Sequence, residues 1–452
     1  MRSFVVFNAL CIISLLSSTY AVAQLSLSAQ LRTRSELRDG QGAPLPAGAD
    51  AAFFTSQRTR LTAGYNMYRL KMGITVQDTR VWGQDVSTIN KSTTADNNGL
   101  MLHEAWAEIR LTDTSYKKSA LTLKIGRQEL VYDDQRLIGN LDWLQQARRH
   151  DAAVLQFTGA AWKLHAGFAF NQNREKASGT RYDQTPPGNY PGNTNSGSSY
   201  KSFEYLYASR SYQQGNISFL FFSDQFNKFH TLTENDIPVK IWDKGNWNRI
   251  TTGVYVTGEY INNTQVTAAA YYQAGKTATG QQLSAGLLSL QAMYKLSEQV
   301  SAGGGVDYTT GGESGTVSYA FDPLYGTPHK FWGLMDYFYA GSGFGSKGLQ
   351  DYYIKTKYKL SEKLQVAVDI HRFSSASTVR DASRNKLSRY FGTEMDMVCN
   401  YTLTNMIGFE AGYSHFFSSP SLSSPEVKNI TAAQKNNNWA YLMINIRPAF
   451  SL

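Results

Sequence analysis

The sequence contains very little cysteine. It has two cysteines in 452 residues, and one of them, Cys11, lies in an apolar N-terminal stretch. This stretch, residues 1–23, carries an early Arg2 and ends in Ala-Val-Ala, which is typical of a secretory signal peptide. Once it is removed, Cys399 stands alone, so the exported chain can form no internal disulfide. We therefore expect packing and backbone hydrogen bonds to hold it together.

Long apolar runs and blocks of like charge are also missing. No uninterrupted apolar segment approaches the roughly 18 residues that a transmembrane helix needs. The net charge is +9, but no basic run of the kind that grips nucleic acid occurs, so nucleic acid is not an expected partner. Proline is scarce at 11 residues, while 28 Tyr, 23 Phe and 8 Trp give an aromatic content that excludes a disordered secreted chain.

The sequence does contain a two-residue alternation of side-chain character, which is the period of a β-strand. It recurs along the chain and predicts 18 strands: 25–38, 53–65, 68–81, 101–111, 121–131, 151–158, 162–170, 200–212, 215–224, 249–260, 265–276, 287–296, 299–310, 350–360, 363–374, 390–402, 405–417 and 438–450. The connections between them alternate between tight turns and long loops. The long loops are predicted at 39–52, 82–100, 132–150, 171–199, 225–248, 311–349, 375–389 and 418–437.

Short turns at one end, long loops at the other and an even strand count are typical of an outer-membrane β-barrel. The predicted fold is all-β: residues 24–452 form a single antiparallel up-and-down barrel in the outer membrane of a Gram-negative bacterium, with membrane lipid around it. A soluble exported β-sandwich or repeat protein is the alternative. The last strand disfavours it, because its apolar face ends in Phe450 as in barrel C-termini. So do aromatic residues at the expected membrane interfaces, namely Tyr352, Tyr353, Tyr358, Tyr413, Phe416 and Phe417.

Charged residues follow the same alternation, most clearly in "LRTRSELR" (31–38). In a strand they share one face, which in a wide barrel is the water-filled lumen. The strand pattern predicts these lumen charges: Arg32, Arg34, Glu36, Arg38, Arg58, Arg60, Lys71, Glu104, Glu108, Lys124, Lys355, Lys357, Asp369, His371, Glu394 and Asp396. A polar lumen is usual in any porin, but the arginines of the first two strands also form a cluster that would attract anions.

The stretch 125–157, "IGRQELVYDDQRLIGNLDWLQQARRHDAAVLQF", resembles the alginate export family of outer-membrane porins. Further pieces of the resemblance are "RTRSELR", "VQDTRVWGQ", "FDPLYGTPHKFWGLMDYF", "GTEMD" and "GYSHFF". The resemblance implies an 18-stranded barrel with an arginine-lined constriction for an anionic polysaccharide. It also implies that these residues form or brace the constriction: Arg127, Glu129, Asp133, Asp134, Arg136, Arg148, Arg149 and Asp151.

Strand parity agrees with this assignment only in part. Arg127 and Glu129 fall on the face of the lipid-facing Ile125, so they lie either at the outer rim or after a bulge that reverses the face. Asp78 and Arg80 raise the same question in the third strand. Parity alone leaves both readings open.

The expected function is a channel that passes anionic substrates, an acidic polysaccharide or oligosaccharide of the alginate type, by passive diffusion. A general or small-anion porin, an outer-membrane enzyme and an adhesin are the alternatives. Periplasmic export components are possible partners. No cofactor or metal is expected, because the seven histidines show no metal-ligand spacing. Catalysis is not expected either, because Ser414 and His415 are neighbours in a strand and face opposite ways.

Two further segments carry predictions. Residues 321–338, "FDPLYGTPHKFWGLMDYF", are too aromatic for a loop surrounded by water, so we expect them to pack into the mouth of the barrel or against its rim. Ordinary loop-loop packing is the alternative. Cys399 shares a face with Met395 and Met397, so it is predicted to face lipid as a small apolar side chain.

Overall fold

The computed structural model describes residues 24–85, 94–95, 100–113, 118–172, 179, 182, 200–234, 237–340 and 347–451. The predicted signal peptide, residues 1–23, lies outside these ranges. So do parts of the predicted loops 82–100 and 171–199. In the described part of the chain no helix has the length and apolarity of a membrane span.

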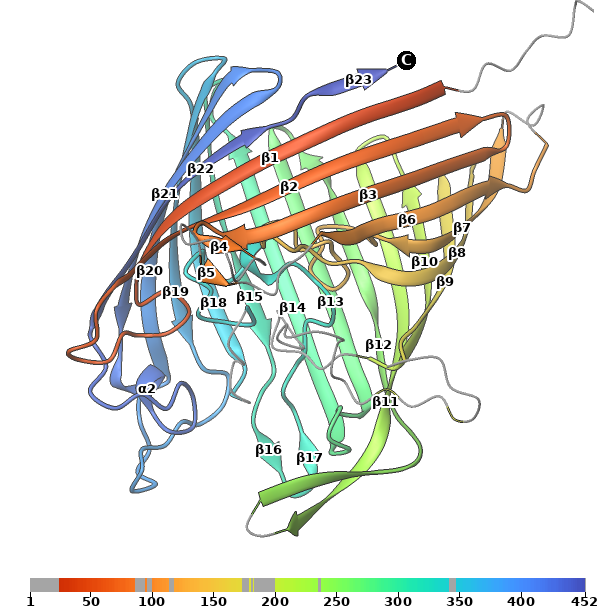
Figure 1. Ribbon diagram of the computed structural model, residues 1–452. Coiled ribbons are helices and arrows are strands. Elements are labelled where there is room, and N and C mark those ends of the chain that lie inside the picture. Colours follow the sequence, from red (N-terminus) through yellow and green to blue (C-terminus); the bar gives the residue numbers. More distant parts are fainter. Residues whose placement is uncertain are drawn as a thin grey trace, which may run out of the picture.

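The chain forms one closed antiparallel β-barrel of 18 wall strands (Figure 1). The wall strands are β1 (Gln24–Asp39), β2 (Ala52–Met67), β3 (Leu70–Val81), β6 (Met101–Arg110), β7 (Ser119–Gln128), β8 (His150–Gly159), β9 (Trp162–Phe170), β10 (Ser202–Ser211), β11 (Gly215–Glu234), β12 (Ile237–Ile261), β13 (Thr264–Lys276), β14 (Gln282–Lys295), β15 (Val300–Thr309), β18 (Leu349–Lys359), β19 (Leu364–Ser374), β20 (Tyr390–Thr404), β21 (Ile407–Ser418) and β22 (Asn436–Ile446). The short elements are β4 (Gln84–Asp85), β5 (Thr94–Ala95), β16 (Glu313–Ser314), β17 (Val317–Ser318), β23 (Ala449–Ser451), η1 (Pro328–Lys330) and α2 (Pro420–Ser423). The predicted fold and strand count are confirmed.

The barrel closes where the last strand meets the first. β22 pairs antiparallel with β1 from Leu31↔Ile446 to Asp39↔Asn438, and β23 continues the pairing at Leu27↔Phe450. This closure pairs the first wall strand with the last, so neither presents a free edge to lipid there. Phe450 is 60% exposed on the outer face, as its place at the end of the apolar face predicts.

Side chains alternate between the two faces of the wall. In β1, Arg32 and Arg34 are buried while Leu31 and Leu37 are exposed to the outside. The same rule corrects two aromatic predictions. Tyr353 and Phe416 are buried on the inner face, because their neighbours Tyr352 and Phe417 occupy the outer one.

The short turns lie at the end where β1 begins, and the long connections lie at the other end. One predicted long loop, 225–248, is wrong. It is a continuation of the β11–β12 hairpin, which projects beyond the barrel wall (Figure 1). Its Asn, Asp, Gly and Pro content predicts a loop, but a register shift between Asn227 and Phe229 absorbs the irregular residues and pairing resumes beyond it.

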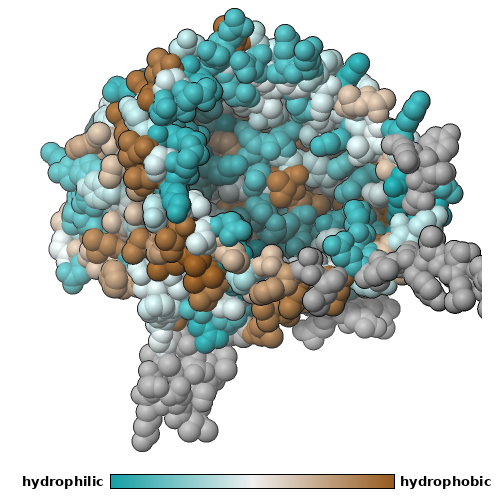
Figure 2. Space-filling view, turned by 90° about the horizontal axis from the view of Figure 1, so that it is seen from above, coloured by the Kyte–Doolittle hydropathy of each residue, from teal (hydrophilic) through white to brown (hydrophobic). Residues whose placement is uncertain are grey.

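The middle of the barrel is filled by chain. Two connections, residues 129–149 between β7 and β8 and residues 319–340 between β15 and β18, bury their side chains inside the wall. We call them the first and second lumen loops. Figure 2 looks into the end where β1 begins and shows a hollow lined mainly by hydrophilic residues. This vestibule gives access to the lumen loops from the short-turn side.

Candidate functional site

The first lumen loop crosses the lumen from one side of the wall to the other. Near one end of the crossing, Tyr207 on β10 and Ser218 on β11 donate hydrogen bonds to Asp133 at 2.8 and 2.7 Å. At the other end, Arg32 on β1 donates to Gln145 at 2.9 Å. Burial raises the pKa of Asp133 to about 6, against the effect of these two hydrogen bonds. The loop therefore divides the lumen instead of lying along its rim.

The arginines of β1 and β2 hold this loop in place. Arg32 donates to the carbonyl oxygens of Asp142 and Leu144 at 2.8 and 3.2 Å, and its guanidinium is 3.2 Å from the Asp142 carboxylate. Arg58 is 2.8 Å from the same carboxylate and is 1% exposed. The Asp142 carbonyl accepts from both Arg32 and Arg58, so charged donors from the wall satisfy a carbonyl of the irregular loop. Arg32 and Arg58 are thus loop anchors as well as positive charges.

Trp143 lies at the joint between the loop and the barrel closure. The Arg34 guanidinium stacks on its ring at 4.1 Å while also binding Glu36 at 2.8 Å. The ring packs edge-on against Tyr441 of β22, with 5.1 Å between ring centroids, and stacks on His329 of the second lumen loop, with 4.1 Å between centroids. One aromatic side chain therefore touches both closing strands and both loops.

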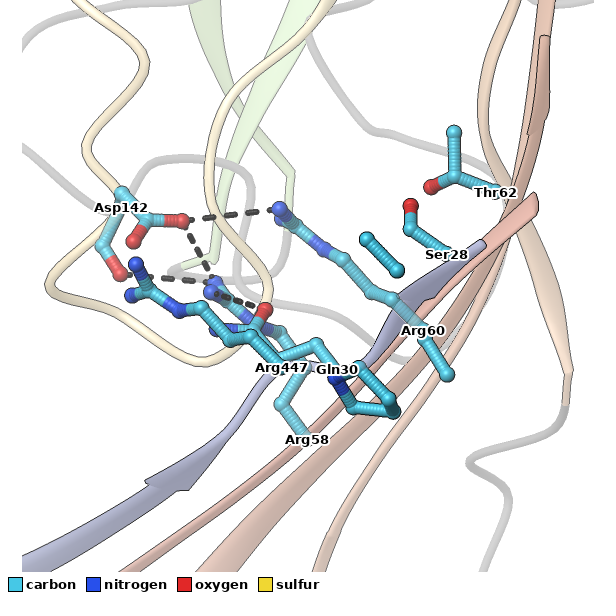
Figure 3. A pocket seen from close by; sticks show the side chains of 10 residues that line it. Ser28, Gln30, Arg58, Arg60, Thr62, Asp142 and Arg447 are labelled. Carbon is cyan, nitrogen blue, oxygen red and sulfur yellow. Dashed lines mark hydrogen bonds and ion pairs between the residues drawn. The ribbon is translucent and has the colours of Figure 1, made fainter. Parts of the chain in front are cut away.

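Arg60 borders a cavity of about 380 Å³ on the short-turn side of the first lumen loop. Figure 3 shows the cavity wall, with the Asp142 carboxylate facing Arg58 and Arg60 and with Arg447 nearby. Arg60 makes only long ion pairs, 3.5 Å to Asp142 and 3.8 Å to Glu129, and it stays 14% exposed. Burial opposes ionisation of Asp142, but Arg58 and Arg32 hold its pKa below the usual value. The cavity thus offers more positive than negative charge.

His103 completes this group and could not be placed from the sequence. It is fully buried, 2.8 Å from Glu129 and 3.0 Å from Arg60. The pairing of β3 with β6 shifts between Thr75 and Val76, so that His103 is the extra residue of a bulge and turns inward. Strand alternation carries no sign of this bulge.

The second lumen loop packs into the barrel, as predicted for residues 321–338. Tyr337 stacks on Phe416 of β21 at 4.0 Å, and the Met335 N–H donates to Glu394 of β20 at 2.7 Å. Arg148 of the first lumen loop donates to the Gly326 carbonyl at 2.6 Å and joins the two loops. Glu394 and Asp396 therefore lie beneath the loop, at 0% and 3% exposure, and not on an open lumen surface.

A second charged group lies on the opposite wall. Arg136 of the first lumen loop is buried between Asp307 of β15, at 2.5 Å, and Asp134, at 3.3 Å. A cavity of about 140 Å³ beside it is bordered by Lys330 of the second loop and by Lys355 of β18. Burial lowers the pKa of Lys330. Lys355 is paired with Asp369 at 2.9 Å, so both of these predicted lumen charges face inward.

Several other predicted lumen charges lie on the inner wall or, for Arg149, in the first lumen loop, each against a neighbouring group. Their contacts are Lys71 to Glu108 at 3.3 Å, Lys124 over the Trp106 ring at 4.0 Å, Glu104 to the Glu129 N–H at 3.1 Å, Arg38 to Glu36 at 2.9 Å, Arg149 to the Met101 sulfur at 3.7 Å, and His371 to Asp351 at 2.9 Å. In the described part of the chain no group of three or more His, Cys, Asp or Glu side chains is placed to hold a metal ion.

Arg127 and Asp151 are not brought to the constriction. They pair with each other at 2.8 Å on the outer face, in register with the outward Ile125 and Ala153. Asp78 and Arg80 likewise pair at 2.7 Å, on the outer face of β3. The placement that the resemblance implied for Arg127 and Asp151 is therefore wrong. Of the two positions that strand parity left open for Arg127, the structure shows the outer one. Glu129 is inside, because the chain leaves the strand after Gln128 and turns into the lumen.

Comparison with known proteins places this geometry in context. A family model described as alginate export matches residues 23–421. No curated protein matches the chain. Similar solved structures include OpdK of Pseudomonas aeruginosa, crystallised with vanillate, at 11% identity and a TM-score of 0.57 over 94% of this chain and 99% of that one. OccAB4 of Acinetobacter baumannii has 13% identity and a TM-score of 0.59 over 94% and 98%, and OccAB1 of the same organism has 11% and 0.59 over 94% and 97%. At this level of identity the likeness shows a shared outer-membrane porin fold.

Proposed function

Because the chain belongs to the alginate export family, we propose that this outer-membrane channel passes small anions and short acidic saccharides by passive diffusion. The observation that carries the proposal is the cavity beside Arg60. Arg58, Arg60 and Arg447 border it, and Asp142 is the acidic residue among its lining side chains. A carboxylate entering from the vestibule meets this positive field at the first lumen loop.

The carboxylates beside the arginines have a role in this proposal. A conducting path needs binding that is favourable enough for entry and weak enough for exit. Asp142 lies within 4 Å of Arg32, Arg58 and Arg60, and Glu129 is 3.8 Å from Arg60. These anions offset part of the positive charge, so a permeating carboxylate is held only loosely.

The lumen loops favour short cargo. They are joined by the bond from Arg148 to Gly326. The first loop is tied to the wall at two places by Arg32 and Arg136, and the second is tied to β20 by the bond from the Met335 N–H to Glu394. Passage of a long polymer would require these contacts to open, whereas a small carboxylate or a short uronate chain needs less space. OpdK, which shares the fold, was crystallised with vanillate, itself a small carboxylate.

The test is the reversal potential of the refolded mature chain in a planar bilayer under a salt gradient, with and without saccharide on one side. We expect anion selectivity, and current block by tri-galacturonate that grows with its concentration. Maltotriose, a neutral saccharide of similar length, is the matched control and should block far less. Equal block by both saccharides, or no selectivity, would instead identify a general porin.

A further inference from the structure

The outer face of the barrel over β7 to β11 is hollowed by an apolar groove. Two adjoining cavities of about 510 and 300 Å³ lie there, and both are bordered by Leu155, Ala166 and Leu206. Alanines of neighbouring strands, Ala153 and Ala166, form part of the floor, while longer apolar side chains stand on either side. The groove follows the strands through the part of the wall that faces the hydrocarbon of the membrane.

A charged pair lies beyond one end of this groove. Arg127 Nε and Nη2 both donate to the Asp151 carboxylate at 2.8 Å, and the two side chains are 37% and 51% exposed. In the register of β7 and β8 they lie one outward pair beyond Ile125 and Ala153, next to the first lumen loop. This is the long-loop end of the wall, which in such barrels is the extracellular end. Glu204, which borders the groove near this end, marks where the apolar surface stops.

We propose that the groove is a binding site for an acylated lipid of the outer leaflet that carries a phosphate on its headgroup. An acyl chain would lie on the alanine floor, where it fills space that a flat wall would not offer. Its phosphate would lie at Arg127, whose guanidinium has five N–H donors and uses two for Asp151.

The polarity of the face fits this occupant. It is apolar toward the middle of the membrane, and its extracellular end carries Arg127 beside the carboxylates of Asp151 and Glu204, so a phosphate there would bind the N–H donors of Arg127 that Asp151 leaves open. The site would also give a role to Arg127, a residue of the family-like stretch that faces outward and takes no part in the lumen. The site is independent of the proposed cargo, because none of its side chains borders the cavities inside the barrel.

The experiment is native mass spectrometry of the refolded chain, released from micelles doped with lipid A, dephosphorylated lipid A or phosphatidylethanolamine. We expect one retained lipid A, preferred at least tenfold over the other two lipids. Ala166→Phe, which fills the groove, and Arg127→Ser should each reduce retention at least fivefold. Ala208→Leu, on β10, fills the smaller of the two cavities, at the short-turn end of the groove. It replaces Ala166→Phe if that variant does not fold.

Matched controls lie elsewhere on the outer face. Ala268→Phe adds the same bulk on β13, opposite the exposed Leu290, and Arg372→Ser removes the same charge on β19. Both should retain lipid A as the unmodified chain does. Equal retention by the groove variants would overturn the proposal. So would an oligomer of this chain that Ala166→Phe dissociates, because the groove would then be an interface between copies.

Discussion

Replacing Arg60 by Ser should weaken the block by a uronate while leaving the barrel folded. Of the two cavity arginines that pair with the first lumen loop, Arg58 and Arg60, Arg60 holds it less tightly, since its ion pairs with Asp142 and Glu129 are 3.5 and 3.8 Å long. Arg58 is a poor choice for this test, because its loss would leave Asp142 without its nearest cation.

The size of the effect follows from Coulomb's law. The attraction between a carboxylate and a guanidinium about 4 Å apart stabilises the bound state by about 1 kcal/mol in a fully water-like medium, and by more where the surroundings are less polar. Because about 1.4 kcal/mol is a factor of ten, the loss of Arg60 should raise the Kd for block at least roughly fivefold. The reversal potential should shift toward cation selectivity at the same time.

The assay is concentration-dependent block of single-channel current by galacturonate, read for the unmodified chain, Arg60→Ser and Arg372→Ser. Arg372 lies on the outer face beside Tyr390, so its loss changes the net charge equally without touching the lumen. An unchanged Kd for Arg60→Ser, or an equal change for Arg372→Ser, would refute the role given to the cavity. A constriction elsewhere, at Lys330 and Lys355, would then be the place to look.

Three further predictions concern the lumen loops. Arg136→Met strands Asp307 and Asp134 without their cation, so we expect a loss of about 3–5 kcal/mol, seen as unfolding at lower denaturant concentration; unchanged unfolding would contradict this. The raised pKa of Asp133, about 6, means that the folded state binds its proton more tightly, so stability falls and the lumen gains a negative charge as the pH rises from about 4 through 6. Anion selectivity should therefore be higher at about pH 5 than at about pH 7, and Asp133→Asn should reduce that difference, which an unaltered pH profile would disprove. Deleting residues 321–338 should raise single-channel conductance, because that segment fills the lumen, and equal conductance would remove it from the conducting path.

The strand pattern predicted the barrel well because each strand reports its own orientation. Alternation in "LRTRSELR" is a local property, and it places Arg32 and Arg34 inside whatever the rest of the chain does. For Arg127 it left the outer rim and a bulge as alternatives, and the structure shows the outer face, whereas the family resemblance suggested the lumen. Alternation therefore included the observed position of Arg127 among its two alternatives, and transfer from the family motif did not.

The contacts of the site could not be predicted from the sequence, because they join segments that are far apart along the chain. Arg32 meets Gln145 only because a loop 113 positions later returns across the lumen. His103 faces inward only because of a bulge, and the 225–248 segment pairs only because a register shift accommodates it. Nothing in local alternation reports a returning loop or an extra residue in a strand.

The position of Trp143 links closure of the barrel to the placement of the first lumen loop. Its ring touches Arg34 on the first strand and Tyr441 on the last, so the strands that meet at barrel closure share one loop residue between them. If β1 separated from β22, the Trp143 ring would lose its contact with either Arg34 or Tyr441. If the loop left the lumen, the buried side chains of Trp439 and Tyr441 would become exposed. The pairing of β1 with β22 and the position of the first lumen loop thus stabilise each other. A barrel that closed without the loop inside would lack the Trp143 contacts that connect its first and last strands.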